Sequence, residues 1–194
     1  MADTFGAWTP YALVRPSVIV GASYSDLGGS LVVQADEGVL RVYGFLTGLR
    51  ASTTGGWHIH TGYECGTSAK QGDHYCPDGD ACNNDPWVGV TYTSDASGNA
   101  EIDERIAGFS LVDGMPVAGR ALVIHDSDAG NTRIGCGIIS PTTAQIAFID
   151  TYPKYAGELS VKGLLALRPV GTGLEIKGSL IGVESSVTAG ATAP

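Results

Sequence analysis

The sequence has 194 residues, 43% of them hydrophobic and only 16% charged, which indicates a folded protein with one main domain rather than a disordered chain. Its 20 acidic and 11 basic residues give a formal net charge of -9, which argues against nucleic acid or an anionic membrane surface as a partner. No segment approaches the roughly 20 consecutive apolar residues that cross a bilayer, so we expect no direct membrane insertion.

Short β-rich segments, several with alternating polarity, run through the first 140 residues. Because side chains alternate between the two faces of a strand, a period of two predicts strands rather than helices. The predicted strands are 17–21, 30–34, 39–46, 56–60, 88–93, 100–106, 120–125 and 133–139. The turn at 94–99 predicts that the strands on either side of it form a hairpin. With 28 glycines and no convincing amphipathic helix, the sequence predicts an all-β sandwich or barrel.

An internal repeat links residues 23–52 with residues 151–186. Each copy has a tyrosine, a glycine, a strand, a glycine-bearing turn, a second strand and the pattern L-x-G-[LV], and the second copy is longer by a few residues in the middle. The second copy stops where the first continues into WHIH. We therefore expect 141–186 to form about three strands of a partial second repeat without metal ligands, followed by a mobile tail at 187–194. Unpaired strand edges are normally covered, so these strands are expected to pair with the first domain, with another copy of the chain or with a foreign partner.

The chain has only four histidines, His58, His60, His74 and His125. His58 and His60 lie two residues apart on a predicted strand, so both imidazoles project from one face. His74 lies in a glycine-rich loop, and His125 ends the strand at 120–125. Imidazole suits copper and zinc, and four nitrogens in a tetragonal arrangement favour Cu(II). The H-x-H pattern alone is a weak signal, and ordinary surface histidines are the alternative interpretation.

Four ordered segments, GWHIH, GDHYCP, GRALVIHDSD and TRIGCGII, resemble the copper/zinc superoxide dismutase family. They correspond to its H-x-H strand, its G-G-H-F-N-P segment, its G-R-x-x-V-V-H strand and its closing R-x-A-C-G-V-I strand. The resemblance covers about residues 17–140 and implies a Greek-key eight-stranded β-barrel there, with 1–16 as an N-terminal extension. It also implies that the copper ligands are His58, His60, His74 and His125.

Two departures from the family pattern favour its copper-only branch, which includes repeat-containing proteins. The family places two further histidines and an aspartate for zinc after the bridging histidine, whereas here no histidine lies between His74 and His125. The carboxylates Asp78, Asp80 and Asp85 are poor zinc ligands by themselves. The loop at 126–132 is also short, so we expect one copper ion, open to solvent, and no zinc.

Without zinc, the second ring nitrogen of His74 needs another partner. Candidate carboxylates are Asp126, Asp128, Asp95 and Asp103, although for any single one of them an ordinary solvated acid is the favoured interpretation.

The four cysteines are consistent with an oxidising compartment. By resemblance, Cys65 and Cys136 form the family's intrachain disulfide, which ties the metal loop to the barrel. Cys76 and Cys82 are close enough to close a small loop next to His74, the alternative being two free buried thiols. The first ten residues show no signal peptide, which leaves either a cytosolic protein or a processed chain. The cysteines favour the second, so we expect a processed chain from the extracellular space or an organelle lumen.

The resemblance implies an enzyme, a copper-only superoxide dismutase that converts superoxide to oxygen and hydrogen peroxide. Arg133 would attract the anionic substrate, and His74 would take up a proton during turnover. We expect a surface role for Arg120 and core packing for Trp57, Tyr75 and Trp87. The alternatives are a copper carrier or store, and a structural subunit of a larger assembly that uses the same scaffold without turnover.

Overall fold

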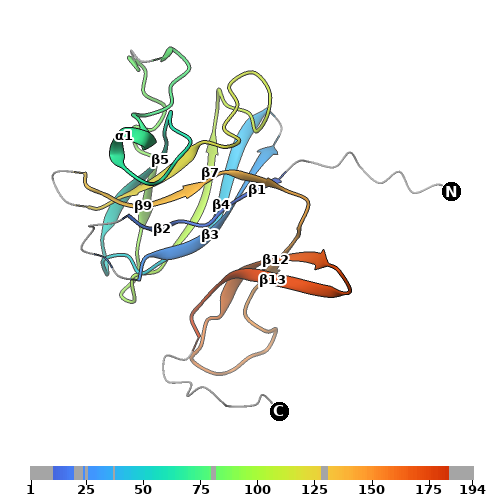
Figure 1. The fold of residues 1–194 in the computed structure, drawn as a ribbon. Helices are drawn as coiled ribbons and strands as arrows, with labels where there is room; N and C mark the ends of the chain where they lie inside the picture. Colours follow the sequence, from blue (N-terminus) through green and yellow to red (C-terminus); the bar gives the residue numbers. More distant parts are fainter. Residues whose placement is uncertain are drawn as a thin grey trace.

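The computed structural model describes residues 11–19, 24, 26–36, 38–79, 82–127 and 131–183, and they form an all-β fold of three antiparallel sheets (Figure 1). The first sheet consists of β10 (Ser140–Thr142), β1 (Tyr11–Val14), β3 (Gly28–Asp36), β4 (Val39–Thr47) and β7 (Ala100–Ile106), in that order. The second consists of β2 (Ser17–Val18), β9 (Arg133–Ile138), β8 (Ala121–His125), β5 (Thr54–Ile59) and β6 (Thr91–Thr93). The third consists of β11 (Gln145–Ile149), β12 (Lys162–Val170) and β13 (Gly173–Ile181).

The helix α1 (Ser68–Gln71) is a single turn that begins after the capping side chain of Thr67. Within the described ranges, no helix is both long and apolar enough to span a membrane.

The main core lies between the first and second sheets. Alternate residues of β3 and β4 point into it, and so do alternate residues of β5, β8 and β9, as the period of two predicts. The fully buried members at its centre include Leu31, Val33, Leu40, Val42, Leu46, Trp57, Ile59, Leu122, Ile124 and Ile134. Burial of this apolar area is the main stabilising contribution, and it fixes which face of the second sheet points outward.

The predicted closed eight-stranded barrel is wrong, because the described strands form separate five-stranded sheets without closure. The predicted hairpin across 94–99 is also wrong: β6 pairs with β5, and β7 pairs with β4. Tyr92 of β6 and Ile102 of β7 are both buried in the main core from different sheets. The connection at 94–99 therefore crosses from the second sheet to the first, and both strands bury side chains in the core between the two sheets.

The predicted N-terminal extension, residues 1–16, contains a strand of the first sheet. β1 pairs with both β3 and β10, and Ala12 and Val14 are fully buried. Since β10 begins at Ser140 and continues to Thr142, the first sheet also extends past the predicted domain boundary at residue 140. Residues 1–10 lie outside the described part of the chain.

The third sheet reproduces part of the first at a constant offset of 134 residues. Leu31 pairs with Gly44 in β3–β4, and Leu165 pairs with Gly178 in β12–β13. A side chain at either glycine would clash with the backbone of the neighbouring strand. An added Cβ would lie 2.2 Å from the Ser30 carbonyl oxygen at Gly44, and 1.9 Å from the Leu164 carbonyl oxygen at Gly178. The two hairpins have equal strand and turn lengths, so the extra residues of the second copy precede β12 rather than lying in the middle.

One face of the third sheet packs against the first sheet, on the side opposite the main core. Leu164 joins Val32, Tyr43 and Phe45 in a second hydrophobic cluster, and the hydroxyls of Ser30 and Ser179 are 3.1 Å apart. The molecule therefore has three layers, with the first sheet in the middle. The predicted tail at 187–194 lies outside the residues that the structure describes.

Candidate metal centre

Strand β5 and the residue that follows it direct two histidines away from the core. Trp57 and Ile59 are fully buried between the sheets, so His58 and His60 point to the opposite face of the second sheet. Both are nevertheless covered, with relative exposures of 6% and 1%. Gly56 leaves room for the first ring, since a Cβ there would lie 2.9 Å from His58 Nε2.

Strand β8 brings His125 to the same face. Its register with β9 shifts at this point: Ile124 pairs with Gly135, whereas His125 pairs with Arg133. Ile134 is therefore the extra residue of a β-bulge. The bulge places Arg133 directly opposite His125.

The loop between β5 and β6 supplies His74. Its backbone runs beside the end of β5, with Thr61 N–H donating to the Asp73 carbonyl at 2.8 Å and Tyr75 N–H donating to Ile59 at 2.9 Å. His60 and His74 are consequently paired in an isolated antiparallel β-bridge.

Two disulfides hold this loop, as predicted. Cys65–Cys136 joins it to β9, and Cys76–Cys82 closes a short segment within it. Two disulfides are typical of proteins from an oxidising, extracellular-type environment.

The four histidines converge into a buried cluster that could hold a metal ion. One nitrogen from each ring lies within 4.8 Å of the others, and the Nε2 atoms of His60 and His125 are 3.4 Å apart. A metal–nitrogen distance of about 2 Å places two ligands of one ion at most about 4 Å apart. The longest nitrogen–nitrogen separation exceeds this limit by less than about 1 Å, so the rings would have to move closer together to bind one ion.

In three of the four rings, the hydrogen bond at Nδ1 determines which nitrogen is free. His60 Nδ1 lies 2.9 Å from the Gly72 carbonyl oxygen and His125 Nδ1 lies 2.8 Å from that of Asn131. A carbonyl only accepts, so each Nδ1 carries the proton and each Nε2 keeps its lone pair. His74 Nδ1 lies 2.7 Å from an oxygen of Asp85, which leaves its Nε2 free in the same way.

His58 differs, because its Nδ1 is buried without a hydrogen-bond partner among the described residues. An unpaired buried nitrogen is costly in the absence of a ligand. A metal ion bound at this nitrogen would satisfy it.

Burial keeps three of the four rings, those of His58, His60 and His125, neutral. Removal from water lowers the pKa of His58 to about 3, and the neighbouring histidines lower it further. The pKa of His60 is also lowered to about 3, mainly by burial, and that of His125 is lowered for the same reason; the positive charge of Arg133 adds to both shifts. Neutral imidazole is the form that binds metal.

The carboxylate that supports His74 is Asp85, which sequence reasoning considered only as a weak zinc ligand. Burial alone would raise the pKa of Asp85, but the N–H of Trp87 and the ring of His74 hold it below its ordinary value. The other suggested carboxylates have different partners: Asp103 pairs with Arg41, and Asp95 accepts hydrogen bonds within its own turn. Asp128, like Asp80, lies outside the described residues.

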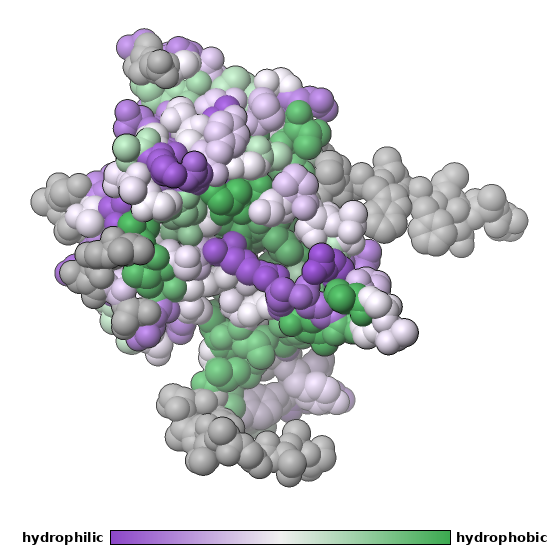
Figure 2. Space-filling view, in the orientation of Figure 1, coloured by the Kyte–Doolittle hydropathy of each residue, from purple (hydrophilic) through white to green (hydrophobic). Residues whose placement is uncertain are grey.

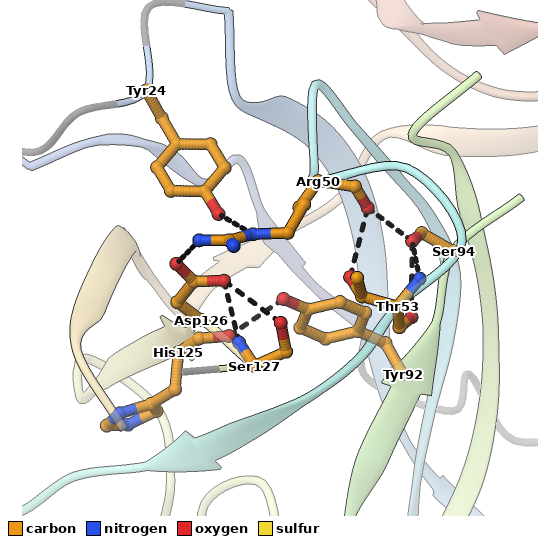
Figure 3. A network of polar contacts seen from close by, with 8 residues as sticks. All are labelled: Tyr24, Arg50, Thr53, Tyr92, Ser94, His125, Asp126 and Ser127. Carbon is orange, nitrogen blue, oxygen red and sulfur yellow. Dashed lines mark hydrogen bonds and ion pairs between the residues drawn. The ribbon is translucent and has the colours of Figure 1, made fainter. Parts of the chain in front are cut away.

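Asp126 belongs to a separate polar network beside His125 (Figure 3). It accepts a 2.7 Å hydrogen bond from Arg50, whose Nε–H also donates to the Tyr24 hydroxyl at 3.4 Å. The Tyr92 hydroxyl donates to the His125 carbonyl at 2.8 Å. The network fixes the backbone of His125, and no spacing in the sequence pointed to Arg50.

A cleft of about 670 Å³ adjoins the cluster and is lined by His60, His74, His125 and Arg133, among others. His74 is the most exposed of the four ligand candidates, with 27% of its side chain accessible. Arg133 donates to the Ser68 carbonyl at 2.9 Å and to the Gln71 side-chain oxygen at 3.2 Å, both in α1. The arginine is thus held at the cleft with its charge retained.

Arg120 is not simply a surface residue. Its guanidinium donates to the Thr61 carbonyl at 2.6 Å and stacks 3.4 Å from the centre of the Tyr75 ring, so it braces the start of the metal loop. Trp57 and Trp87 pack in the main core. The Trp87 indole N–H also donates to the Tyr75 carbonyl at 2.8 Å, next to His74.

Comparison with known proteins leaves the family open, since no family model matches the chain and no curated protein matches its sequence.

Proposed function

We propose that the chain is a copper-only superoxide dismutase. The observation that carries the proposal is the cluster of four histidines, three of them buried and each with one nitrogen available, beside a cleft that contains Arg133. Four imidazoles without a carboxylate or thiolate ligand suit copper better than magnesium, calcium or a structural zinc ion. The second nitrogen of His74 is bonded to Asp85, so the proposed site needs no zinc to orient that ring.

The residues of the chain perform the remaining tasks. Copper, when bound, supplies the one-electron chemistry by which one superoxide is oxidised to oxygen and another, with two protons, is reduced to hydrogen peroxide. Arg133 provides a permanent positive charge that attracts the anion into the cleft, despite the net charge of -9. The backbone carbonyls of Gly72 and Asn131 and the Asp85 carboxylate hold the rings in place.

We also propose that the first two sheets correspond to the Greek-key fold of the superoxide dismutase family. The chain passes from the first sheet (β3, β4) to the second (β5, β6), returns to the first (β7) and crosses again (β8, β9), which supports this assignment. The two disulfides support a secreted protein or one from an oxidising lumen.

Turnover by the copper-loaded protein tests the enzymatic proposal. Substitution Arg133→Ala should reduce superoxide consumption at least roughly tenfold at low ionic strength, because electrostatic steering is lost, while copper affinity stays nearly unchanged. Arg133→Lys should retain part of the rate, since it keeps the charge. The control is Arg168→Ala, which changes the net charge equally on the exposed part of β12.

Unchanged turnover in Arg133→Ala would contradict the role of this residue. Copper bound without any turnover in the unmodified chain would instead favour a copper carrier, store or structural subunit.

A further inference from the structure

The two faces of the third sheet differ sharply in composition. One face packs on the first sheet, and the opposite face, which we call the outer face, is formed by every second residue of its three strands. The outer face comprises Gln145, Ala147, Ile149, Gly163, Leu165, Leu167, Pro169, Leu174, Ile176, Gly178 and Leu180. None of these residues is charged. The charged residues of the same strands, Lys162, Arg168, Glu175 and Lys177, all lie on the side that faces the first sheet.

Several apolar side chains of the outer face are exposed. Leu174 is 57% exposed, Ile176 is 55% exposed and Leu180 is 46% exposed. Figure 2 shows hydrophobic surface in the lower part of the molecule, where Figure 1 places β12 and β13. An antiparallel sheet with one solvated face normally carries polar residues there. This sheet has the opposite arrangement, and a contiguous exposed apolar face is typical of an interaction surface.

The internal repeat relates the outer face to the main core of the first two sheets. At the offset of 134 residues, five aliphatic residues of the outer face correspond to five of the main core. They are Leu165, Leu167, Leu174, Ile176 and Leu180, which match Leu31, Val33, Leu40, Val42 and Leu46. All five counterparts are fully buried against the second sheet. The outer face therefore has the side chains and spacing of a sandwich core, without an opposing layer among the described residues.

We propose that the outer face is an interface on which a second copy of this chain packs, sheet against sheet, about a two-fold axis. A two-fold contact requires a patch that is complementary to itself, and an uncharged aliphatic sheet meets that requirement. Two chains of net charge -9 can approach here without placing like charges opposite each other. The second sheet of another copy is not available as the opposing layer, because its apolar face is already occupied by its own first sheet.

The area of the outer face determines how tightly the two copies are expected to associate. β12 and β13 have nine residues each and β11 has five, so at the usual strand spacing the patch measures at most roughly 30 Å by 15 Å. Two such patches bury roughly 900 Å² in total, which is the range of weak, transient interfaces, so we expect a dimer that forms and dissociates with concentration.

Sedimentation of the purified full chain over a range of concentrations tests the proposal. The unmodified chain should pass from monomer to dimer, and Ile176→Lys should weaken association at least roughly tenfold, because each copy would bury an unpaired charge. Val112→Lys is the matched control: Val112 is also 55% exposed, and the charge change is the same. Circular dichroism would confirm that both variants keep the fold.

A monomer at every concentration would overturn the proposal, and so would a dimer that Ile176→Lys leaves intact. Salt dependence gives a second test on the unmodified chain. An apolar interface should hold or strengthen as salt is added, whereas strong weakening would show that a charged surface joins the copies.

Discussion

At the scale of single residues, the candidate site depends on how each imidazole is held. Two Nδ1 atoms face backbone carbonyls and one faces a carboxylate, while His58 Nδ1 has no partner within the described ranges. The ring with the carboxylate partner, His74, is also the most exposed of the four. Its orientation is therefore the one most sensitive to a single substitution.

Removing the charge of Asp85 should make the orientation of the His74 ring less fixed. We expect Asp85→Asn to reduce copper affinity about tenfold and Asp85→Ala to reduce it by up to about 100-fold, because an outer partner of a ligand histidine fixes its ring and raises its basicity. Competition with a chelator would measure both. Asp78→Asn is the control, since this carboxylate lies in the same loop but accepts a hydrogen bond from the Asn83 backbone. Equal affinity in all three variants would show that Asp85 does not support the site.

The candidate ligands could be predicted from the sequence, whereas their partners could not. His58 and His60 share a face because strand geometry requires it, and His74 and His125 were identified by resemblance. Asp85 lies 11 residues from His74, on a long loop whose path depends on two disulfides and on contacts with β5. No local pattern determines such a path, so neither Asp85 nor Arg50 could be placed in advance.

At the scale of elements, length and periodicity decided which strands were visible in the sequence. The alternation at 39–46 and 100–106 corresponds closely to β4 and β7. β1 and β10 have four and three residues, too few for a period to appear, and the strands predicted at 17–21 and 88–93 are longer than β2 and β6, which have two and three residues. The turn at 94–99 indicates where the chain reverses but not which sheet it enters, since that depends on the packing of Tyr92 and Ile102.

The disulfides offer a test of how the metal loop is anchored. Replacing Cys65 and Cys136 with serine should lower the free energy of unfolding by about 4 kcal/mol, because this bridge closes a loop 71 residues long. The same change at Cys76 and Cys82, which are 6 residues apart, should cost about 2 kcal/mol. Denaturant unfolding measures both, and equal costs would contradict the loop-closure explanation.

At the scale of the whole molecule, the third sheet determines whether the chain behaves as one cooperative unit. Leu164 is fully buried between the third sheet and the first, so Leu164→Ala should destabilise the protein by about 2–4 kcal/mol. Val170→Ala, on the exposed end of the same strand, should change stability by no more than about 0.5 kcal/mol. Thermal or denaturant unfolding would measure the difference. Equal effects would indicate that the third sheet does not contribute to the cooperative fold.

The repeat was visible in the sequence, but its packing was not. The glycines and aliphatic residues of 151–186 predicted strands similar to those of the first copy. Which of the two faces meets the first sheet depends on side chains such as Val32, Tyr43 and Phe45, which come from a different part of the chain.

The most direct test of the central claim is titration of the metal-free protein with Cu(II), followed by electron paramagnetic resonance. We predict one copper per chain and a tetragonal spectrum with nitrogen coupling, both of which should be lost in a His60→Ala, His125→Ala double variant. A chain that binds no copper stoichiometrically, or that gives the same spectrum without these two histidines, would contradict the account.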